Sequence, residues 1–338
     1  MTDAARADVA VVIVNYRTPE LTKRCLAALA GERETLPKLR AVVVDGGSGD
    51  RSAQNLSRTV TRPEYRDWVS FLPLTVNGGF GWANNQAILT LAREGHAFEY
   101  IYLLNPDAEP KKGAVASLVE ELERHPSCAA AGSRLLDEHG GLVPSAFRFP
   151  SPGREFVSAA QSETVGRMLR VASTVVKTED SADVDWVTGA SVMLRTAALH
   201  ETGLFDDGFF LYFEEVELMH RLHAHGWTVR HVPASVVTHL EGAATGAGSA
   251  GVRPMPSYWY RSRHRYFALT RGPAGVFAAN LARIAGQGVA VLKTVVKSSQ
   301  RKNRIRLAEI IRASSGGAAS VPRWGDAPGK LPVWIMRP

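Results

Sequence analysis

Short, unbroken apolar runs that alternate with helix-like stretches constrain the fold of this chain more than any other feature. The runs include Val9–Val14, Ala41–Val44 and Tyr100–Leu104. Strands without polar alternation are buried on both faces, as parallel strands covered by helices are. The helix-like stretches Leu21–Ala30 and Ala83–Arg93 can supply that cover. We therefore predict an α/β fold with a mostly parallel sheet flanked by helices.

The second half of the chain predicts fewer strands and ends in basic helices. We expect one strand over Trp186–Leu194, a helix from about Glu214 to Ala224 and a short strand over Val229–Val232. The Gly/Ala/Ser-rich residues 242–251 are typical of a mobile loop. We thus predict a catalytic domain over residues 1–245, a basic helical extension over 246–313 and a loosely ordered tail over 314–338. The expected helices of the extension are Tyr258–Thr270, Val276–Ser298 and Arg301–Ala313.

Composition excludes several classes of protein. The two cysteines cannot build a disulfide framework or a cysteine-type zinc site, which favours a reducing compartment. No signal peptide is expected, because the first apolar run is short and is not preceded by a basic segment. The longest apolar stretch, Val276–Val296, contains Asn280, Arg283, Gln287 and Lys293, so we expect no transmembrane helix.

Charge is distributed unevenly along the chain. Residues 1–241 hold 24 basic and 31 acidic side chains, whereas residues 242–338 hold 16 basic and 2 acidic side chains. Such segregation favours a polyanionic partner, and an anionic membrane or a nucleic acid would both serve. A basic face that folds back on the acidic part is the alternative.

Polar residues follow each of the first four predicted strands. In an open parallel sheet, ligands bind outside the carboxyl ends of the strands, so these residues are the first candidates for a site. Asp, Asn and Gly are also ordinary turn formers, and it is their convergence that indicates a function. The four sets are Asn15-Tyr16, Asp45-Gly46-Gly47-Ser48-Gly49-Asp50, Asn77-Gly78-Gly79-Phe80-Gly81 and Asn105-Pro106-Asp107.

The residues after the first strand exclude three nucleotide-binding classes. Asn15–Pro19 contains no glycine, so it lacks the glycine motif of dehydrogenases and the Gly-rich, basic loop of sugar-1-phosphate nucleotidyltransferases. A phosphate-binding P-loop is also missing. Asp45 can accept hydrogen bonds from a base or ribose, and Asp107 can offer oxygen to Mg²⁺ or Mn²⁺ on a diphosphate. This combination predicts a sugar-nucleotide site.

The chain resembles family 2 glycosyltransferases of the GT-A fold, and especially bacterial rhamnosyltransferases that build cell-wall and surface polysaccharides. The order and spacing of five blocks carry the resemblance over residues 9 to about 240. These blocks are Val11–Tyr16, Val43–Asp50, Asn77–Asn85, Leu103–Ala108 and Phe209–Glu217.

The resemblance implies a donor site and a metal site. Asp107 is implied as the metal ligand of a degenerate Asp-x-Asp motif whose first acid is Asn105 here. His239 is implied near the metal or the diphosphate, with a purely structural histidine as the alternative. Mn²⁺ or Mg²⁺ is the expected cofactor. The predicted donor-binding residues are Asn15, Tyr16, Arg17, Asp45, Asn77, Gly78, Gly79, Asn105, Asp107 and Arg263; a basic surface helix is the alternative for Arg263.

The resemblance also implies a catalytic base in the acidic run that follows Phe209–Phe213. Glu215 is the predicted base, since it matches the second member of the family's acidic pair, and Glu214 remains its rival. The family usually has Asp at this position. Capping of a helix dipole is the alternative for Glu214. Trp186, Thr188, Gly189 and Tyr212 are the predicted acceptor-binding residues.

Taken together, the sequence predicts an inverting hexosyltransferase. L-Rhamnose from dTDP-rhamnose is the expected donor sugar, and another dTDP- or UDP-sugar is the alternative. The expected acceptor is a saccharide or a lipid-linked saccharide, met at the cytoplasmic face of the cell membrane. A basic nucleic-acid-binding protein is the rival class, and we expect no nucleic acid, because such a protein would not require Asp45, Asp107 and Glu215 together.

Overall fold

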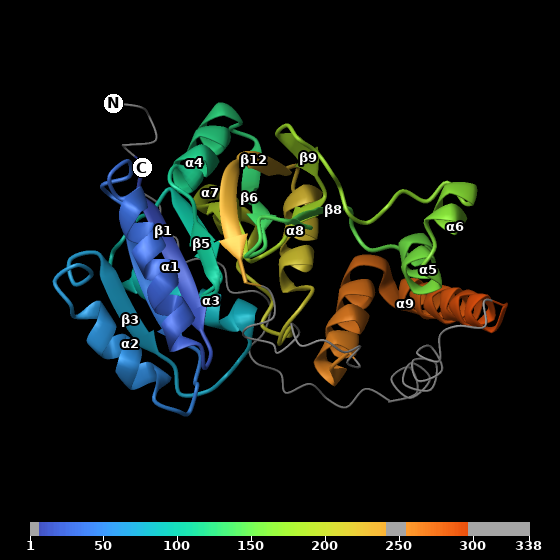
Figure 1. Cartoon of the computed structure of the whole chain (residues 1–338), viewed down its shortest axis with the longest axis horizontal. Coiled ribbons are helices and arrows are strands. Elements are labelled where there is room, and N and C mark those ends of the chain that lie inside the picture. The colour runs from blue at the N-terminus through green and yellow to red at the C-terminus, as the bar shows by residue number, and fades with distance from the viewer. Residues whose placement is uncertain (1–6, 241–254, 297–338) are drawn as a thin grey trace.

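A computed structural model describes residues 7–240 and 255–296, and Figure 1 presents its layout. A twisted sheet with helices on both faces forms the main body. Three helices, α5 (Pro152–Ala160), α6 (Glu163–Met168) and α9 (Ser257–Val296), pack together beside it. The described part of the chain therefore consists of a sheet domain and a helical arm.

The first strands of the sheet are parallel, as their unbroken apolar sequences predict. The strand order is β3-β2-β1-β4-β11-β6-β12-β5. Pairing is parallel from β3 through β4 and between β6 and β12, and β11 runs antiparallel between β4 and β6. The bounds are β1 Val9–Asn15, β2 Arg40–Asp45, β3 Val69–Pro73, β4 Tyr100–Leu104, β5 Ala108–Pro110, β6 Cys128–Leu136, β11 Ser191–Arg195 and β12 Thr228–His239.

Smaller strands extend or flank this sheet. The strand β7 (Leu142–Val143) pairs with β6, and β9 (Ala182–Val184) pairs with β12. A separate two-stranded sheet joins β8 (Ala146–Phe147) to β10 (Trp186–Val187).

Alternate residues of β1 pack into two different cores. Val9, Val11 and Ile13 lie in the core under the helices α1, α2 and α4, whereas Ala10 and Val12 lie in the core under α3, α7 and α8. Burial on both faces explains why the strand shows no polar alternation. The bounds are α1 Pro19–Glu32, α2 Ser52–Val60, α3 Phe80–Arg93, α4 Ala114–Arg124, α7 Thr196–Thr202 and α8 Glu214–Ala224.

Two strands differ from the sequence prediction. The stretch Trp186–Leu194 is not one strand, because β10 pairs with β8 while β11 lies in the main sheet, with residues 188–190 as the break between them. The predicted short strand Val229–Val232 extends to His239, since it continues its pairing with β6 after an irregularity between Val232 and Val236. His239 is consequently the last residue of a strand.

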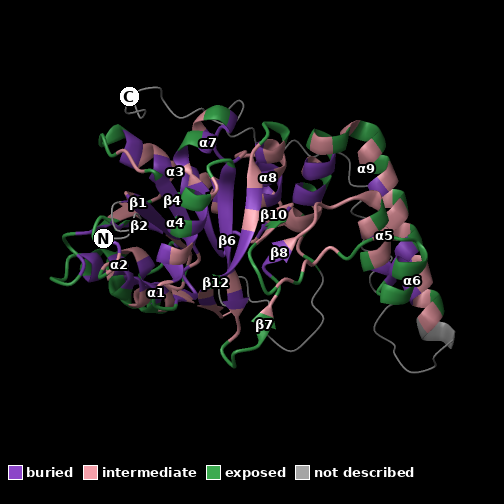
Figure 2. Ribbon diagram, turned by 90° about the horizontal axis from the view of Figure 1, so that it is seen from above, coloured by how far each residue is buried: buried purple, intermediate pink, exposed green. Residues whose placement is uncertain are grey.

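The arm joins segments that are distant in sequence. Helix α9 is kinked at Gly272, which has a φ of 65° and is followed by Pro273. The half of α9 after the kink lies along α5, and a side chain at Gly286 would collide with the carbonyl oxygen of Phe156. Figure 2 places α5, α6 and α9 together at one end of the molecule. Residues 241–254 and 297–338, where the predicted loop, the domain boundaries and the last predicted helix fall, lie outside the described residues.

Helix α9 is more apolar than the sequence analysis expected. Between Ser257 and Lys293 it is long and apolar enough to cross a membrane, by length and composition alone. We expected no transmembrane helix because polar residues interrupt this stretch. Arg283, however, is the only charged residue between Pro273 and Leu292. In this structure the helix is kinked and packs on α5.

A first prediction concerns Gly79, the residue before α3. It has a φ of 93°, and a Cβ atom there would collide with the carbonyl oxygen of Phe210. We expect Gly79→Ala to lower the free energy of unfolding by about 1–3 kcal/mol, measured by denaturant unfolding. Gly31→Ala is the control, because Gly31 lies in α1 with nothing within 4 Å of its Cβ position, and it should be neutral or slightly stabilising. Equal effects of the two substitutions would contradict this packing.

Candidate active site

The first two strands of the sheet end in a hydrogen-bonded network around Asp45. Asn15 lies opposite Asp45 in the parallel register, and its Nδ2 donates to Asp45 Oδ1 at 2.8 Å. The Ser48 hydroxyl donates to the same oxygen at 2.7 Å, and the Ser48 backbone N–H donates to Oδ2 at 3.1 Å. Asp45 is only 2% exposed. Both carboxylate oxygens therefore hold the loops after β1 and β2 in place.

Arg17 and Tyr16 lie at the open side of this network. The Arg17 backbone N–H donates to the Ser48 hydroxyl, and its Nε donates to the Ser48 carbonyl at 2.9 Å. The Arg17 guanidinium lies 5.1 Å from the centroid of the Tyr16 ring. The structure thus brings the predicted donor residues of these two loops together. Ser48 organises them, and sequence reasoning missed its role although it lies inside a recognised block.

The glycine-rich loop before α3 packs closely on the loop after β2. A Cβ atom at Gly47 would lie 2.6 Å from the carbonyl carbon of Val76, so only glycine permits this approach. The Asn77 side-chain carbonyl accepts a hydrogen bond from the Gly79 backbone N–H at 3.0 Å. Gly78 leaves room for the ring of Trp82. The three loops after β1, β2 and β3 consequently form one continuous edge.

Asp107 and His239 face each other where β5 pairs with β12. The His239 Nε2 atom lies 3.2 Å from Asp107 Oδ1 and 3.3 Å from Asn105 Nδ2. The antiparallel register places His239 opposite Ala108, and the Leu240 N–H donates to the Asp107 carbonyl. The structure therefore brings together the three residues that were predicted around a metal ion.

The chemistry of this cluster fits a divalent cation. Apart from the His239 ring at 3.2 Å, the buried Asp107 Oδ1 has no hydrogen-bond partner among the described residues, and the buried His239 Nδ1 has none, which is costly unless a ligand contributes. Carboxylate oxygen suits Mg²⁺ and Mn²⁺, and imidazole also binds transition metals. Among the described residues, no group of three or more His, Cys, Asp or Glu side chains could hold a metal. Further ligands would have to come from a bound substrate and water.

Two acidic side chains begin helix α8. Tyr212 and Phe213 precede them with φ values of 69° and 70°, a left-handed conformation that is uncommon for residues other than glycine. This turn starts the helix at Glu214. Strain of this kind persists only where surrounding contacts hold it, and it often marks a functional site.

Burial controls the protonation of this acidic pair. Glu214 is 3% exposed, and burial together with the neighbouring charge of Glu215 raises the pKa of its carboxyl group well above the usual range. Burial also raises the pKa of Glu215, while backbone N–H groups including that of Gly189 oppose the rise. One side-chain oxygen of each residue has no hydrogen-bond partner. The two carboxyl groups are close enough to titrate as a pair, and burial favours their protonated forms.

Of the predicted acceptor residues, Gly189 lies nearest to the acidic pair. A Cβ atom at Gly189 would lie 3.9 Å from Glu215 Cβ and 3.2 Å from the ring of Phe80. The next residue, Ala190, accepts a hydrogen bond from the Asn105 backbone N–H at 2.9 Å. The break between β10 and β11 thus connects the Asp107 turn to Glu215.

The other three predicted acceptor residues, Trp186, Thr188 and Tyr212, contact other parts of the chain. Trp186 stacks on Phe147 in the small sheet, with ring centroids 4.2 Å apart. The Thr188 backbone N–H donates to the Ser145 carbonyl. Tyr212 stacks on Tyr258 from the first turn of α9, with ring centroids 6.0 Å apart.

Arg263, which was predicted to bind the donor, is not at the site. Its Nε donates to Glu155 at 2.9 Å and its Nη1 donates to Asn280 at 2.7 Å. Its side chain is buried where α9 packs against α5. Arg283 binds the same carboxylate at 3.1 Å. Arg263 therefore joins the two halves of the kinked helix to α5, a role that its position in a basic segment could not indicate.

Comparison with known proteins supports the architecture and the reaction class. Residues 10–148 match the family described as Glycosyl transferase family 2. The chain is 28% identical over 311 residues to an N-acetylglucosaminyl-diphospho-decaprenol L-rhamnosyltransferase of Mycobacterium tuberculosis. That match covers 89% of this chain and 97% of the relative.

Two solved structures share the fold. The mannosyltransferase PcManGT from Pyrobaculum calidifontis, in complex with GDP-Man and Mn²⁺, superposes with a TM-score of 0.54 at 16% identity, over 91% of this chain and 86% of that one. GalNAc-T7 with UDP, GalNAc and Mn²⁺ superposes with a TM-score of 0.54 at 15% identity. The match covers 79% of this chain and 51% of that one. The chain is thus a glycosyltransferase with the GT-A fold, in which residues 10–148 match the family 2 model and the whole sequence is similar to a bacterial rhamnosyltransferase.

Proposed function

We propose that the chain is an inverting rhamnosyltransferase that moves L-rhamnose from dTDP-rhamnose to a lipid-linked saccharide during synthesis of a cell-envelope polysaccharide. The match to the mycobacterial L-rhamnosyltransferase, which covers nearly the whole of both chains, supports this choice of sugar and acceptor. Another dTDP- or UDP-sugar is the alternative donor. The observation that carries the proposal is the link from the Asp107 turn through Ala190 and Gly189 to Glu215.

Asp107 and His239 would hold Mn²⁺ or Mg²⁺ together with the donor diphosphate. The metal, when bound, neutralises the charge that develops on the leaving diphosphate. Asn105 lies beside this pair, with its Nδ2 atom 3.3 Å from His239 Nε2. Asp45 and Ser48 fix the loops that present Tyr16 and Arg17 to the nucleotide.

Glu215 is the better candidate for the base. Its side chain is only partly buried, whereas Glu214 is buried beside Gly81 of α3, where burial raises the pKa of its carboxyl group. Glu215 accepts the proton of the acceptor hydroxyl as that oxygen attacks the anomeric carbon opposite the leaving diphosphate.

The arm presents an apolar face that we assign to the membrane. Phe277, Leu281 and Leu292 on α9 are 70%, 57% and 66% exposed. An amphipathic helix with such a face lies in the interface of a bilayer, and basic residues favour anionic lipid. Lys293 is turned toward the arm, since its Nζ donates to the Ala160 carbonyl at the end of α5. Binding of the apolar face to the bilayer would bring the protein to a lipid-linked acceptor at the cytoplasmic face of the membrane.

Removal of the base tests the assignment of roles. We expect Glu215→Gln to lower kcat by at least about 100-fold while the affinity for the sugar nucleotide is retained, because the amide cannot accept the proton. Steady-state transfer assays and donor titration measure the two quantities. Robust transfer by this variant would move the base to another residue.

Glu214→Gln is the matched control. Glutamine mimics the protonated carboxyl group, so this variant should retain most of the activity. Since the folded state raises the pKa of Glu214, wild-type stability declines as pH rises above the ordinary carboxyl range, about 4.3. We expect Glu214→Gln to be more stable than wild type at neutral pH and to lose this advantage below pH of about 4. In wild type, kcat should fall as Glu215 becomes protonated.

The metal site can be tested without turnover. We expect Mn²⁺ and dTDP-rhamnose together to raise the melting temperature of the wild-type protein, because ligands that bind only the folded state stabilise it. Asp107→Asn should abolish the metal-dependent part of this rise and reduce transfer below detection. Glu109→Gln, on the adjacent strand, is the control and should keep the full shift. A metal-dependent shift that survives in Asp107→Asn would overturn the assignment.

Vesicle flotation tests the membrane face. We expect wild-type protein to float with anionic vesicles at low salt, and the double substitution Phe277→Ser with Leu281→Ser to reduce the partition coefficient by about tenfold or more. Leu269→Ser is the control, since Leu269 is 52% exposed on the other half of α9 and should leave binding unchanged. If wild-type protein stays unbound, the membrane proposal fails.

A further inference from the structure

We propose that Arg265 of α9 is a positioning residue that holds the acidic pair of α8 in its catalytic geometry, acting through Asp206. The inference rests on the proposed function, because Glu215 is the base there. It concerns a residue outside the region that matches the family, residues 10–148. Helix α9 would then be part of the catalytic machinery as well as part of the arm.

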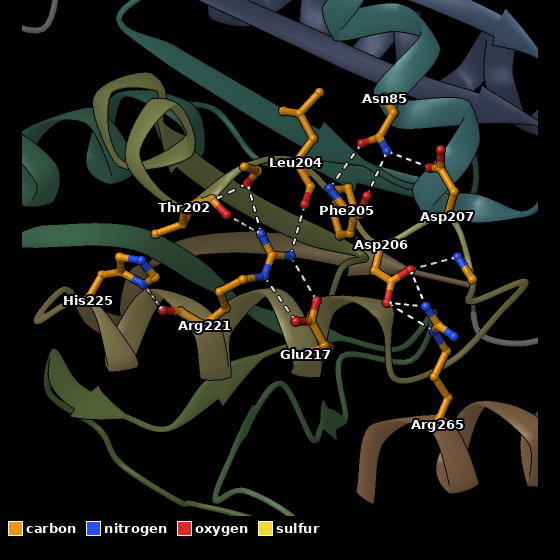
Figure 3. Close-up of polar contacts among 12 residues, drawn as sticks. Asn85, Thr202, Leu204, Phe205, Asp206, Asp207, Glu217, Arg221, His225 and Arg265 are labelled. Carbon is orange, nitrogen blue, oxygen red and sulfur yellow. Dashed lines mark hydrogen bonds and ion pairs between the residues drawn. The ribbon is translucent and has the colours of Figure 1, made fainter. Parts of the chain in front are cut away.

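The acidic pair follows a segment without helix or strand, residues 203–213, which needs other support. One anchor comes from α3, as Figure 3 illustrates. Asn85 Nδ2 donates to the Phe205 carbonyl at 2.9 Å and to Asp207 Oδ1 at 2.7 Å, and Asn85 Oδ1 accepts from the Phe205 N–H. Phe205 and Phe209 are fully buried. The first half of the segment is therefore fixed to the sheet domain.

The second anchor comes from α8 itself. Arg221 makes a two-pronged ion pair with Glu217 and donates to the carbonyls of Thr202 and Leu204 at the start of the segment (Figure 3). This arginine ties α8 to the residues that precede the segment. Its hydrogen bonds to the segment end at Leu204 and do not reach Asp206 or the residues after it, where the chain turns into α8.

Helix α9 supports this stretch directly. Arg265 Nε lies 2.9 Å from Asp206 Oδ2 and its Nη2 lies 2.8 Å from Oδ1, a paired geometry that also fixes orientation (Figure 3). The Arg265 guanidinium lies 5.5 Å from the centroid of the Phe209 ring. The Ser262 hydroxyl donates to the Leu211 carbonyl at 2.9 Å. One turn of α9 thus contacts the segment at three successive points.

The local sequence is adapted to this arginine. Asp206 Oδ1 also accepts a hydrogen bond from the Gly208 N–H at 2.8 Å, and a side chain at Gly208 would collide with the Arg265 guanidinium. Two residues later, the Phe210 carbonyl accepts from the Phe80 N–H beside Gly79. We call the Arg265–Asp206 pair the clamp. Through the segment that it holds, the clamp connects α9 to the left-handed turn before Glu214 and to the glycine-rich donor loop.

Loss of the Asp206–Arg265 pair should affect the local geometry of the site more than the stability of the whole protein. The Asp206 side chain is 13% exposed and that of Arg265 is 38% exposed, so solvent weakens the contribution of the pair to global stability. Geometry is more sensitive, because a displacement of about 1 Å in a catalytic group can cost about 100-fold in rate. Loss of the clamp should therefore lower kcat more than it lowers the melting temperature.

Substitution of either partner tests the clamp. We expect Arg265→Met and Asp206→Asn each to lower kcat for transfer by about 10- to 100-fold, with the donor dissociation constant changed less than twofold. The double variant should be no worse than the poorer single variant, since both remove one interaction. Arg265→Lys should restore only part of the rate, because an ammonium group cannot form the paired contact. Arg261→Ala is the control, since Arg261 is exposed on the same helix and contacts only Ser257 among the described residues.

Hydrogen exchange provides a readout that does not depend on turnover. In Arg265→Met, the amides of residues 205–217 should exchange faster, while those of β1 and α1 remain unchanged. Unchanged exchange in this segment, or faster exchange with undiminished kcat, would overturn the inference. If Arg265→Met does not fold, the nearly isosteric Asp206→Asn carries the same test. A wild-type protein without transfer activity would overturn the proposed function, and hydrogen exchange would still decide whether the clamp exists.

Discussion

Burial of the central strands on both faces is the constraint on which the rest of this structure depends. Because β1 packs into one core with Val9 and Val11 and into the other with Ala10 and Val12, polar residues are confined to its ends. The parallel arrangement of β1 and β2 then brings Asn15 and Asp45 to one edge of the sheet. Chemistry at that edge is a consequence of how the core is built.

Much of the sheet domain could be predicted from the sequence, and the reasons are local. The strands β1, β2 and β4 are uninterrupted apolar runs, and the residues that follow them reach one edge in any parallel sheet. The antiparallel insertion of β11 and the length of β12 could not be predicted, because both depend on pairing with β6. The roles of Arg263 and Arg265 also depend on nonlocal contacts, with Glu155 and Asp206.

The candidate site contains buried polar atoms in two places, the Asp107–His239 cluster and the acidic pair Glu214–Glu215. His239 Nδ1 and single oxygens of Glu214 and Glu215 are buried without hydrogen-bond partners among the described residues, and Asp107 Oδ1 has only the His239 ring at 3.2 Å. Isolated groups of this kind cost stability, and their presence at the edge of an otherwise well-packed sheet is expected where a ligand supplies the missing contacts. The surrounding structure keeps them in place through Asn105 and the left-handed turn at Tyr212.

We propose that one base, Glu215, directs a single in-line displacement at the anomeric carbon. The configuration of the new glycosidic bond tests this most directly. NMR of the product formed from dTDP-rhamnose with Mn²⁺ should reveal an anomeric configuration opposite to that of the donor. A product that retains the donor's configuration would contradict the account, because it requires a second displacement or a different site.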